Sequence, residues 1–221
     1  MIDIETYKHF LGIATFPQYC TSFFNLDLTR DYVSAAEAVY DWTLGKHILR
    51  LPLNCDTPLF LLYHELTHIY DMDMHMNGEK NHDFCLTGYM EYHASQVELM
   101  LLMGATKIND IISFSMSDSI ICFDSSVQQY LEQKLITACN LICDEDCIER
   151  GKGVGVFFNF LGLKSICCMF ATDYCDNFDC SKFAERLPSF LLFEVRKDMQ
   201  GWIEDVEKSV MLYSQMMDYI V

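Results

Sequence analysis

Hydrophobic side chains are spaced through residues 57–71 in a way that predicts a helix with one apolar face. Thr57 and Pro58 offer an N-cap followed by proline at the first helical position. Glu65 is the only charged carboxylate between residues 57 and 70, and the apolar positions are Leu59, Phe60, Leu61, Leu62, Leu66 and Ile69. We therefore expect this helix to pack against the body of the protein.

Alternating positions predict a half-buried strand at residues 47–53, directly before this helix, with three side chains on one side, Leu49, Leu51 and Leu53. Pro52 has no N–H to donate, so we expect an edge strand or a strand end. An edge strand here could accept an extended peptide by added pairing, whereas a merely blunted edge is the alternative. Residues 31–43 mix helix and strand preferences, and the turn at residues 44–46 favours a hairpin.

Helical periodicity returns at residue 89 and continues to about residue 104, after a polar stretch at residues 71–88 that we expect to be a loop. Further helices are expected at residues 124–149, 154–172, 179–197 and 200–220, with a break at the glycines of residues 151–155. The pattern predicts a predominantly helical α+β fold. We expect residues 1–104 to carry the small sheet and the candidate catalytic helices, and residues 105–221 to form a helical region packed on them within one compact domain.

The first predicted helix carries the sequence HELTH at residues 64–68, which matches the pattern H-E-x-x-H. On a helix, positions four apart share a face, so His64 and His68 can hold one metal ion from adjacent turns. Glu65 lies about 100° round from His64, beside the metal, where it can take a proton from water during hydrolysis. The motif therefore indicates a hydrolytic zinc site. The alternative is a core helix with two incidental histidines.

A catalytic zinc needs a third protein ligand, which must come from outside this helix. Glu91 lies 91 − 68 = 23 positions after His68, on the second predicted helix, and completes a set of two histidines and one glutamate. His93 is the main rival, and it points about 200° away from Glu91 on a helix. The extended metzincin pattern is not met, because residues 71 and 74 are aspartate and methionine.

Three other residues of the second helix bear on the same site. Ala94 and Ser95 are small, which would let the two helices approach closely. Glu98 returns to the face of Glu91 and could orient a ligand histidine. A solvated carboxylate is the alternative interpretation of Glu98.

The chain has 32 acidic and 15 basic residues, a formal charge of −17 that would repel nucleic acid and anionic membrane surfaces. The acidic amino end shows no secretory signal, so we expect a cytoplasmic protein. Eleven scattered cysteines favour reduced thiols, and a cysteine stripe on the 124–149 helix is expected to pack in the core. The apolar stretch 154–171 contains Asn159 and Lys164, which favours a buried helix over a membrane span.

The motif at residues 64–68, followed after a loop by a helix with Glu91-Tyr92-His93-Ala94, resembles the gluzincin metallopeptidases, especially small ones of the ImmA/IrrE type. The strand that leads into the motif helix agrees with that layout. The resemblance covers about residues 31–104. Relatives of this type commonly cleave an intracellular repressor and are often encoded by phages or mobile elements. This chain departs from them in its long cysteine-rich second half and in the absence of a recognisable DNA-binding segment.

The resemblance implies that His64, His68 and Glu91 hold zinc and that Glu65 is the general base. It also implies that a tyrosine or histidine stabilises the oxyanion, for which Tyr89, Tyr92 and His93 all remain candidates. We therefore expect a zinc metallopeptidase that hydrolyses a protein or peptide substrate. The main alternative is a catalytically silent, metal-stabilised regulatory protein that binds a partner through its acidic surface or its C-terminal helices. In a third reading the motif is accidental and the protein is purely structural.

Overall fold

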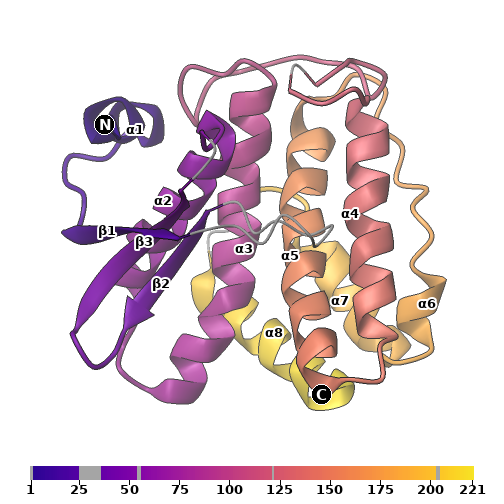
Figure 1. Ribbon diagram of the computed structural model, residues 1–221. Helices are drawn as coiled ribbons and strands as arrows, with labels where there is room; N and C mark the ends of the chain where they lie inside the picture. Colours follow the sequence, from indigo (N-terminus) through magenta and orange to yellow (C-terminus); the bar gives the residue numbers. More distant parts are fainter. Residues whose placement is uncertain (1, 25–35, 54–55, 121, 203–204) are drawn as a thin grey trace.

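A small β-sheet stands beside a group of long helices in the computed structural model of the protein (Figure 1). The structure describes residues 2–24, 36–53, 56–120, 122–202 and 205–221. In these residues the elements are α1 (Ile4–Leu11), β1 (Tyr19–Phe24), β2 (Glu37–Asp41), β3 (Lys46–Pro52), α2 (Leu59–His75), α3 (Lys80–Leu102), α4 (Val127–Ile142), α5 (Cys147–Phe170), α6 (Ser181–Ala184), α7 (Ser189–Asp198) and α8 (Val206–Ile220). The predicted predominantly helical α+β fold is confirmed.

The sheet has the order β1-β3-β2, with β3 parallel to β1 and antiparallel to β2. The predicted β2–β3 hairpin is confirmed, and Asp41 stabilises its turn by accepting hydrogen bonds from the backbone N–H groups of Thr43 and Leu44. Of the two alternatives that Pro52 indicated, the edge strand is wrong, because the unpredicted strand β1 pairs with the other side of β3, and the strand end is confirmed. Pro52 is tolerated because it is the last residue of β3.

Helices α2 and α3 form an antiparallel pair joined by a turn of four residues, 76–79. The predicted loop at residues 71–88 is therefore wrong over most of its length. Asp83 accepts hydrogen bonds from the backbone N–H groups of Asn77 and Gly78, 3.0 Å each, which closes the short turn. Buried Met72 and Leu86 on either side of the turn pack into the core. Tertiary burial thus outweighs the polar composition that favoured a loop.

The prediction of a helix break at residues 151–155 is also wrong, because α5 runs through all of these glycines. The chain turns earlier, where Asp146 caps α5 by accepting from the backbone N–H of Ile148. The glycines serve close packing instead, since a Cβ on Gly153 would lie 2.8 Å from the backbone nitrogen of Ile142. Of the three cysteines in the predicted core stripe, Cys139 is buried as expected, whereas Cys143 and Cys147 are exposed and flank the turn between α4 and α5, so the prediction is wrong for these two.

Helix α3 lies between the sheet-bearing part and the α4–α5 pair, with α8 running below them in the view of Figure 1. One hydrophobic cluster joins the two parts, and it extends from Tyr7 on α1 to Ile220 on α8. Helices α3 and α5 approach each other closely at Gly162, where an added Cβ would lie 2.2 Å from the carbonyl oxygen of Tyr92 and 2.9 Å from the Cβ of Ser95. Ser95 thus permits contact with α5, whereas we expected it to permit contact with the motif helix.

Helix α5 is long and apolar enough to cross a membrane by length and composition alone. However, 78% of its apolar window is buried inside the protein, as predicted for residues 154–171. Lys164 on this helix is buried and pairs with Asp176, with 2.8 Å between Nζ and Oδ2. The helix is therefore the central core element of the described fold.

Replacing Gly162 with alanine is expected to lower the free energy of unfolding by about 2–3 kcal/mol, because the added methyl group meets the backbone of α3. Gly155 is the matched control on the same helix, since its added Cβ would meet only the Cγ of Glu91, at 3.9 Å. Gly155→Ala should therefore be neutral or stabilising by up to about 1 kcal/mol. Urea unfolding followed by circular dichroism measures both. Equal stabilities of the two variants would contradict the close contact of α3 and α5.

Candidate metal centre

Helix α2 presents His64 and His68 on one face, as the four-residue spacing predicts. Both side chains are buried, and their ring centroids lie 4.8 Å apart. A carboxylate oxygen of Glu65 joins them, and the three ligand atoms lie within 4.8 Å of one another. Within the described ranges this is the group of histidines, cysteines and carboxylates that could hold a metal ion. A buried His-Glu-His group with metal-binding capacity is therefore present.

Glu91 reaches the same place from α3. Its Oε2 lies 3.6 Å from Nε2 of His64 and 3.8 Å from Nε2 of His68. These distances exceed those of hydrogen bonds, which are about 2.7–3.2 Å. They are close to the separation of roughly 3.3–3.5 Å between two donors that share one tetrahedral ion with bonds of about 2.0–2.1 Å. The Glu91 oxygen therefore lies at distances from both imidazole nitrogens that one shared ion would allow.

The second half of the chain holds this oxygen in place. Asn159 on α5 donates a hydrogen bond from Nδ2 to Oε2 of Glu91, 3.1 Å away. Asn159 is one of the polar residues that interrupt the apolar 154–171 stretch. The sequence therefore indicated an unusual polar residue, but it did not indicate that Glu91 is the residue it contacts. This polar interruption of the apolar stretch therefore contacts the candidate metal centre through Glu91.

Glu98 supports His64 from the other side of the ring. Its Oε2 lies 2.9 Å from Nδ1 of His64, although the ring N–H is poorly aligned with it for a hydrogen bond. Its Oε1 accepts a hydrogen bond from the hydroxyl of Tyr130 on α4. Glu98 is completely buried, so the interpretation as a solvated carboxylate is wrong. Carboxylates in this position commonly fix the orientation and tautomer of a metal-ligating histidine.

The buried carboxylates make the centre attractive to a cation. Burial raises the pKa of Glu91, but the attraction of His68 and His64 and the hydrogen bond from Asn159 outweigh it and lower the pKa to about 2. Burial lowers the pKa of His68 to about 4, which keeps this imidazole neutral and free to coordinate. Burial also opposes charge on His64, yet its contacts with Glu91 and Glu98 raise its pKa to about 10. Positive charge is thus favoured between the carboxylates, supplied either by a proton on His64 or by a metal ion.

Glu65 is held by the sheet. The backbone N–H of Ala38 in β2 donates to its Oε2 over 2.8 Å, a contact that sequence reasoning did not anticipate. This bond also shows that the N–H of Ala38 points away from β3, toward α2. Burial raises the pKa of Glu65 to about 7. A carboxylate with this pKa can both accept and return a proton near neutral pH.

His93, the rival third ligand, is engaged elsewhere. Its Nδ1 lies 3.0 Å from both carboxylate oxygens of the fully buried Asp71. Of the three candidates for oxyanion stabilisation, Tyr92 donates its hydroxyl to the carbonyl of Gly201. Tyr89 stays beside His93, with ring centroids 5.7 Å apart. The hydroxyl of Tyr92 is therefore already engaged, and an oxyanion role for His93 or Tyr89 stays a prediction.

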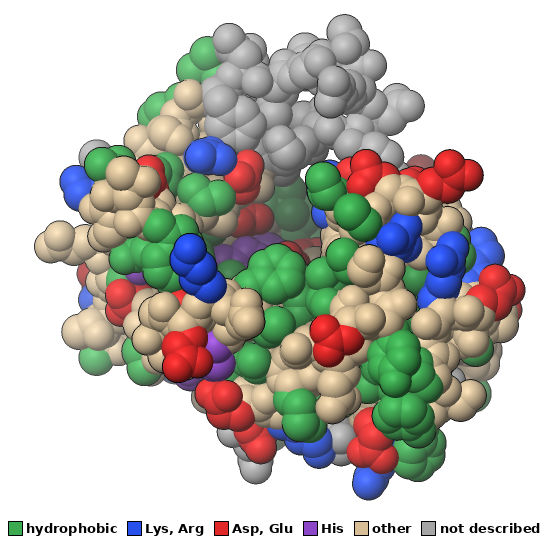
Figure 2. Space-filling model, turned by 90° about the horizontal axis from the view of Figure 1, so that it is seen from below, with side chains coloured by type: hydrophobic (Ala, Val, Ile, Leu, Met, Phe, Trp, Pro, Cys, Tyr) green, Lys and Arg blue, Asp and Glu red, His purple; other side chains and the backbone are tan. Residues whose placement is uncertain are grey.

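A pocket of about 1010 Å³ begins at Glu91 and extends between α3, α4, α5 and α8. The side chain of Glu91 is 26% exposed, which connects the metal donors to this space. Figure 2 shows histidine and acidic side chains at the floor of a hollow on this face, with hydrophobic side chains beside them. Among the described residues, Glu91 therefore connects the candidate metal centre to this pocket.

Comparisons of the chain with protein-family models, with curated proteins and with solved structures found no match.

Proposed function

We propose that the protein is a zinc-dependent peptidase of the gluzincin type. The observation that carries the proposal is the convergence of His64, His68 and Glu91 at separations suited to one tetrahedral ion. Two imidazoles and one carboxylate are a donor set of catalytic zinc sites, which leaves a fourth position for water or substrate. The resemblance to small ImmA/IrrE-type metallopeptidases at residues 64–68 and 91–94 supports the same conclusion.

When bound, zinc supplies a Lewis acid that polarises the scissile carbonyl and makes water more acidic. Glu65 then accepts the proton of the attacking water and returns it to the leaving amine. The Ala38 N–H holds one oxygen of Glu65, which leaves the other free for this proton. Asn159 and Glu98 keep Glu91 and His64 oriented throughout. The residues present thus provide metal ligands, general base and outer support.

The experiment is hydrolysis of a peptide library by the purified full chain, loaded with one equivalent of zinc. Cleavage is expected with zinc, and it should be lost after chelation and restored by added zinc. Loss without restoration would point to unfolding, so circular dichroism of the chelated protein serves as the control. Cleavage that is unaffected by complete removal of metal would contradict the proposal.

The second candidate is a catalytically silent protein whose metal centre has a structural or regulatory role. The observation that favours it is the placement of His64 between Glu91 and Glu98, an ion-pair arrangement that needs no metal. Stoichiometric zinc without hydrolysis of any library peptide would support this candidate over the peptidase.

A further inference from the structure

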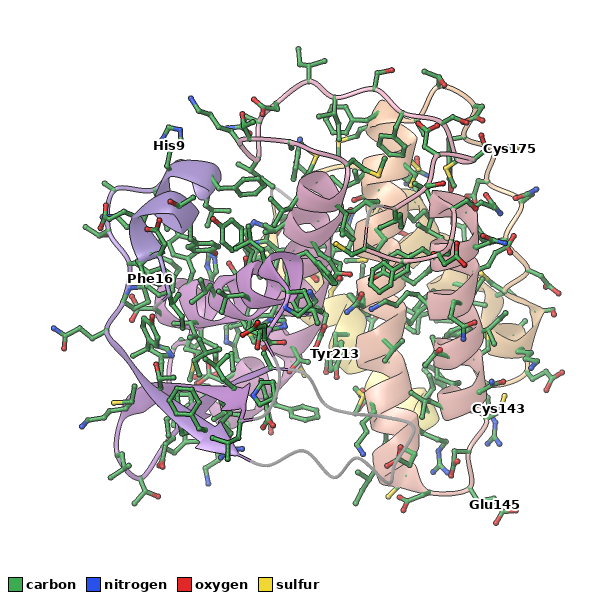
Figure 3. All side chains as sticks on the ribbon, turned by 45° about the horizontal axis from the view of Figure 1, so that its top comes forward. His9, Phe16, Cys143, Glu145, Cys175 and Tyr213 are labelled. Atoms are coloured by element: carbon green, nitrogen blue, oxygen red, sulfur yellow. The ribbon has the colours of Figure 1, made fainter. Side chains whose placement is uncertain are left out.

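The pocket beside Glu91 is lined mainly by apolar side chains, and the steps of hydrolysis do not use them. In Figure 3 the pocket can be found between the labelled Tyr213, near the middle of the molecule, and the α4–α5 connection, where Cys143 and Glu145 are labelled beside the lining residue Asp144. The apolar lining comes from three helices and the end of α4, and includes Phe84, Leu141, Val156, Tyr213 and Met217. Glu91 belongs both to this lining and to the metal centre. A group held in the pocket would therefore lie beside the reacting atoms.

The volume of the pocket indicates how large a bound group can be. Sites for ligands of drug size have volumes of about 300–1,000 Å³. At about 1010 Å³ the pocket is at the top of that range. It can thus receive several neighbouring side chains of a peptide, and not one alone.

Polar groups in the same lining suit a peptide backbone. Thr87, Thr137 and Asn140 contribute two hydroxyls and an amide to walls that are otherwise mostly apolar. The Thr137 hydroxyl donates its proton to the Gln133 carbonyl, so it can only accept from a ligand, and the Asn140 oxygen accepts from Lys182, which leaves the amide N–H groups to donate. A peptide needs such groups because each buried backbone N–H or C=O requires a hydrogen-bond partner. A hydrocarbon chain has no donor or acceptor with which these groups could form hydrogen bonds.

The charges of the lining indicate what flanks the apolar segment. Among the described lining residues, the acidic ones are Glu91, Asp144 and Glu149, and the basic one is Lys152. Lys152 is already paired with Glu149, at 2.6 Å. Asp144 is an exposed lining residue whose Oδ1 accepts from the backbone N–H of Asp146, and the whole chain carries a formal charge of −17. Basic groups are therefore favoured next to the apolar segment, and acidic groups are repelled.

We propose that this pocket binds an apolar segment of a polypeptide substrate, flanked by basic residues, next to the bond that is cleaved. This inference rests on the proposed peptidase function and names its substrate class. Contact with the apolar pocket walls would provide affinity. Because Glu91 belongs both to the pocket lining and to the candidate metal centre, the bound segment would lie beside that centre.

The test measures binding to the zinc-loaded full chain with the substitution Glu65→Gln, so that no cleavage is required. The probes are three fluorescent ten-residue peptides, read by polarisation. The first has a central Phe-Leu-Val-Phe segment between lysines, the second has serine and glycine in place of that segment, and the third has aspartates in place of the lysines. The first peptide should bind at least about tenfold more tightly than either of the others.

Two further substitutions in the same background locate the binding. Gly155→Leu fills the pocket from α5, where a Cβ is tolerated, and should weaken the first peptide about tenfold. Met217→Gln makes the α8 wall polar and should weaken it severalfold, whereas Met211→Gln, on the same helix but outside the lining, should change it less than about twofold. Zinc stoichiometry and circular dichroism should be unchanged in all three variants, which excludes unfolding as the cause.

Equal binding of the three peptides, or equal effects of the Met217 and Met211 substitutions, would overturn the inference. Cleavage of the first two peptides at equal rates by the unsubstituted protein would also overturn it, while leaving the peptidase proposal intact. If the first peptide binds selectively but the unsubstituted protein does not hydrolyse it, the peptide-binding pocket would be confirmed and the peptidase proposal would fail.

Discussion

Replacing Glu65 with glutamine is expected to reduce peptide hydrolysis by about 10³- to 10⁴-fold and to leave zinc binding intact. Glutamine has nearly the same shape, and its amide oxygen can still accept the hydrogen bond that Ala38 donates to Glu65. It cannot accept a proton from water near neutral pH, so only the base is removed. Single-turnover hydrolysis, together with zinc content by mass spectrometry, separates the two effects.

Glu37→Gln is the matched control for this substitution. Glu37 is in β2 next to Ala38, but it pairs with Arg50 on the surface, at 2.9 Å. Its loss should change hydrolysis by less than about twofold, since exposed ion pairs contribute little. Retention of more than one tenth of the activity by the Glu65 variant would remove this residue from the mechanism.

The loss of peptide hydrolysis at low pH should come from protonation of Glu65. Burial raises the pKa of Glu65 to about 7, and a bound cation lowers it from there. The carboxylate is the active form, so hydrolysis should fall as the pH drops below the pKa of Glu65 in the zinc-loaded protein. The residual activity of the Glu65→Gln variant should lack this loss at low pH.

Replacing Glu91 with glutamine is expected to weaken zinc binding by at least about 10³-fold, because it removes a charged ligand. Glu98→Gln should weaken binding by only about 10–100-fold, because Glu98 contacts the ring of His64 and would act through it without being a ligand itself. Competition with a chromogenic chelator measures both affinities. The two glutamates lie seven positions apart on the same buried helix, so each serves as the structural control for the other. Equal losses, or a larger loss for Glu98→Gln, would contradict the assignment of Glu91 as the third ligand.

The motif on α2 could be predicted from the sequence because its chemistry is local. Two histidines four positions apart necessarily share a helix face, and the structure brings Glu65 beside them. Glu91 required one further assumption, namely that the next helix packs antiparallel on the first. That assumption holds because the α2–α3 turn is short, which makes the two helices neighbours.

The outer parts of the centre could not be predicted in this way. Asn159 and Tyr130 reach Glu91 and Glu98 from positions 68 and 32 residues away in the sequence. No local periodicity indicates which polar residue of an apolar helix meets which carboxylate. The predicted break at residues 151–155 failed for the same reason, namely that local sequence does not show long-range contacts. A glycine can indicate either a turn or a close helix contact, and only the neighbouring helix decides between them.

The zinc-edge X-ray absorption spectrum of the full chain, loaded with one equivalent of zinc, tests the proposed metal centre directly. A centre built from His64, His68 and Glu91 should give four nitrogen or oxygen donors at about 2.0–2.1 Å, with the outer-shell scattering of two imidazoles. The imidazole signal should be reduced by half in a His68→Ala variant. Sulfur donors at about 2.3 Å would place zinc on the cysteines and contradict the proposed centre, as would failure of the protein to bind zinc at all.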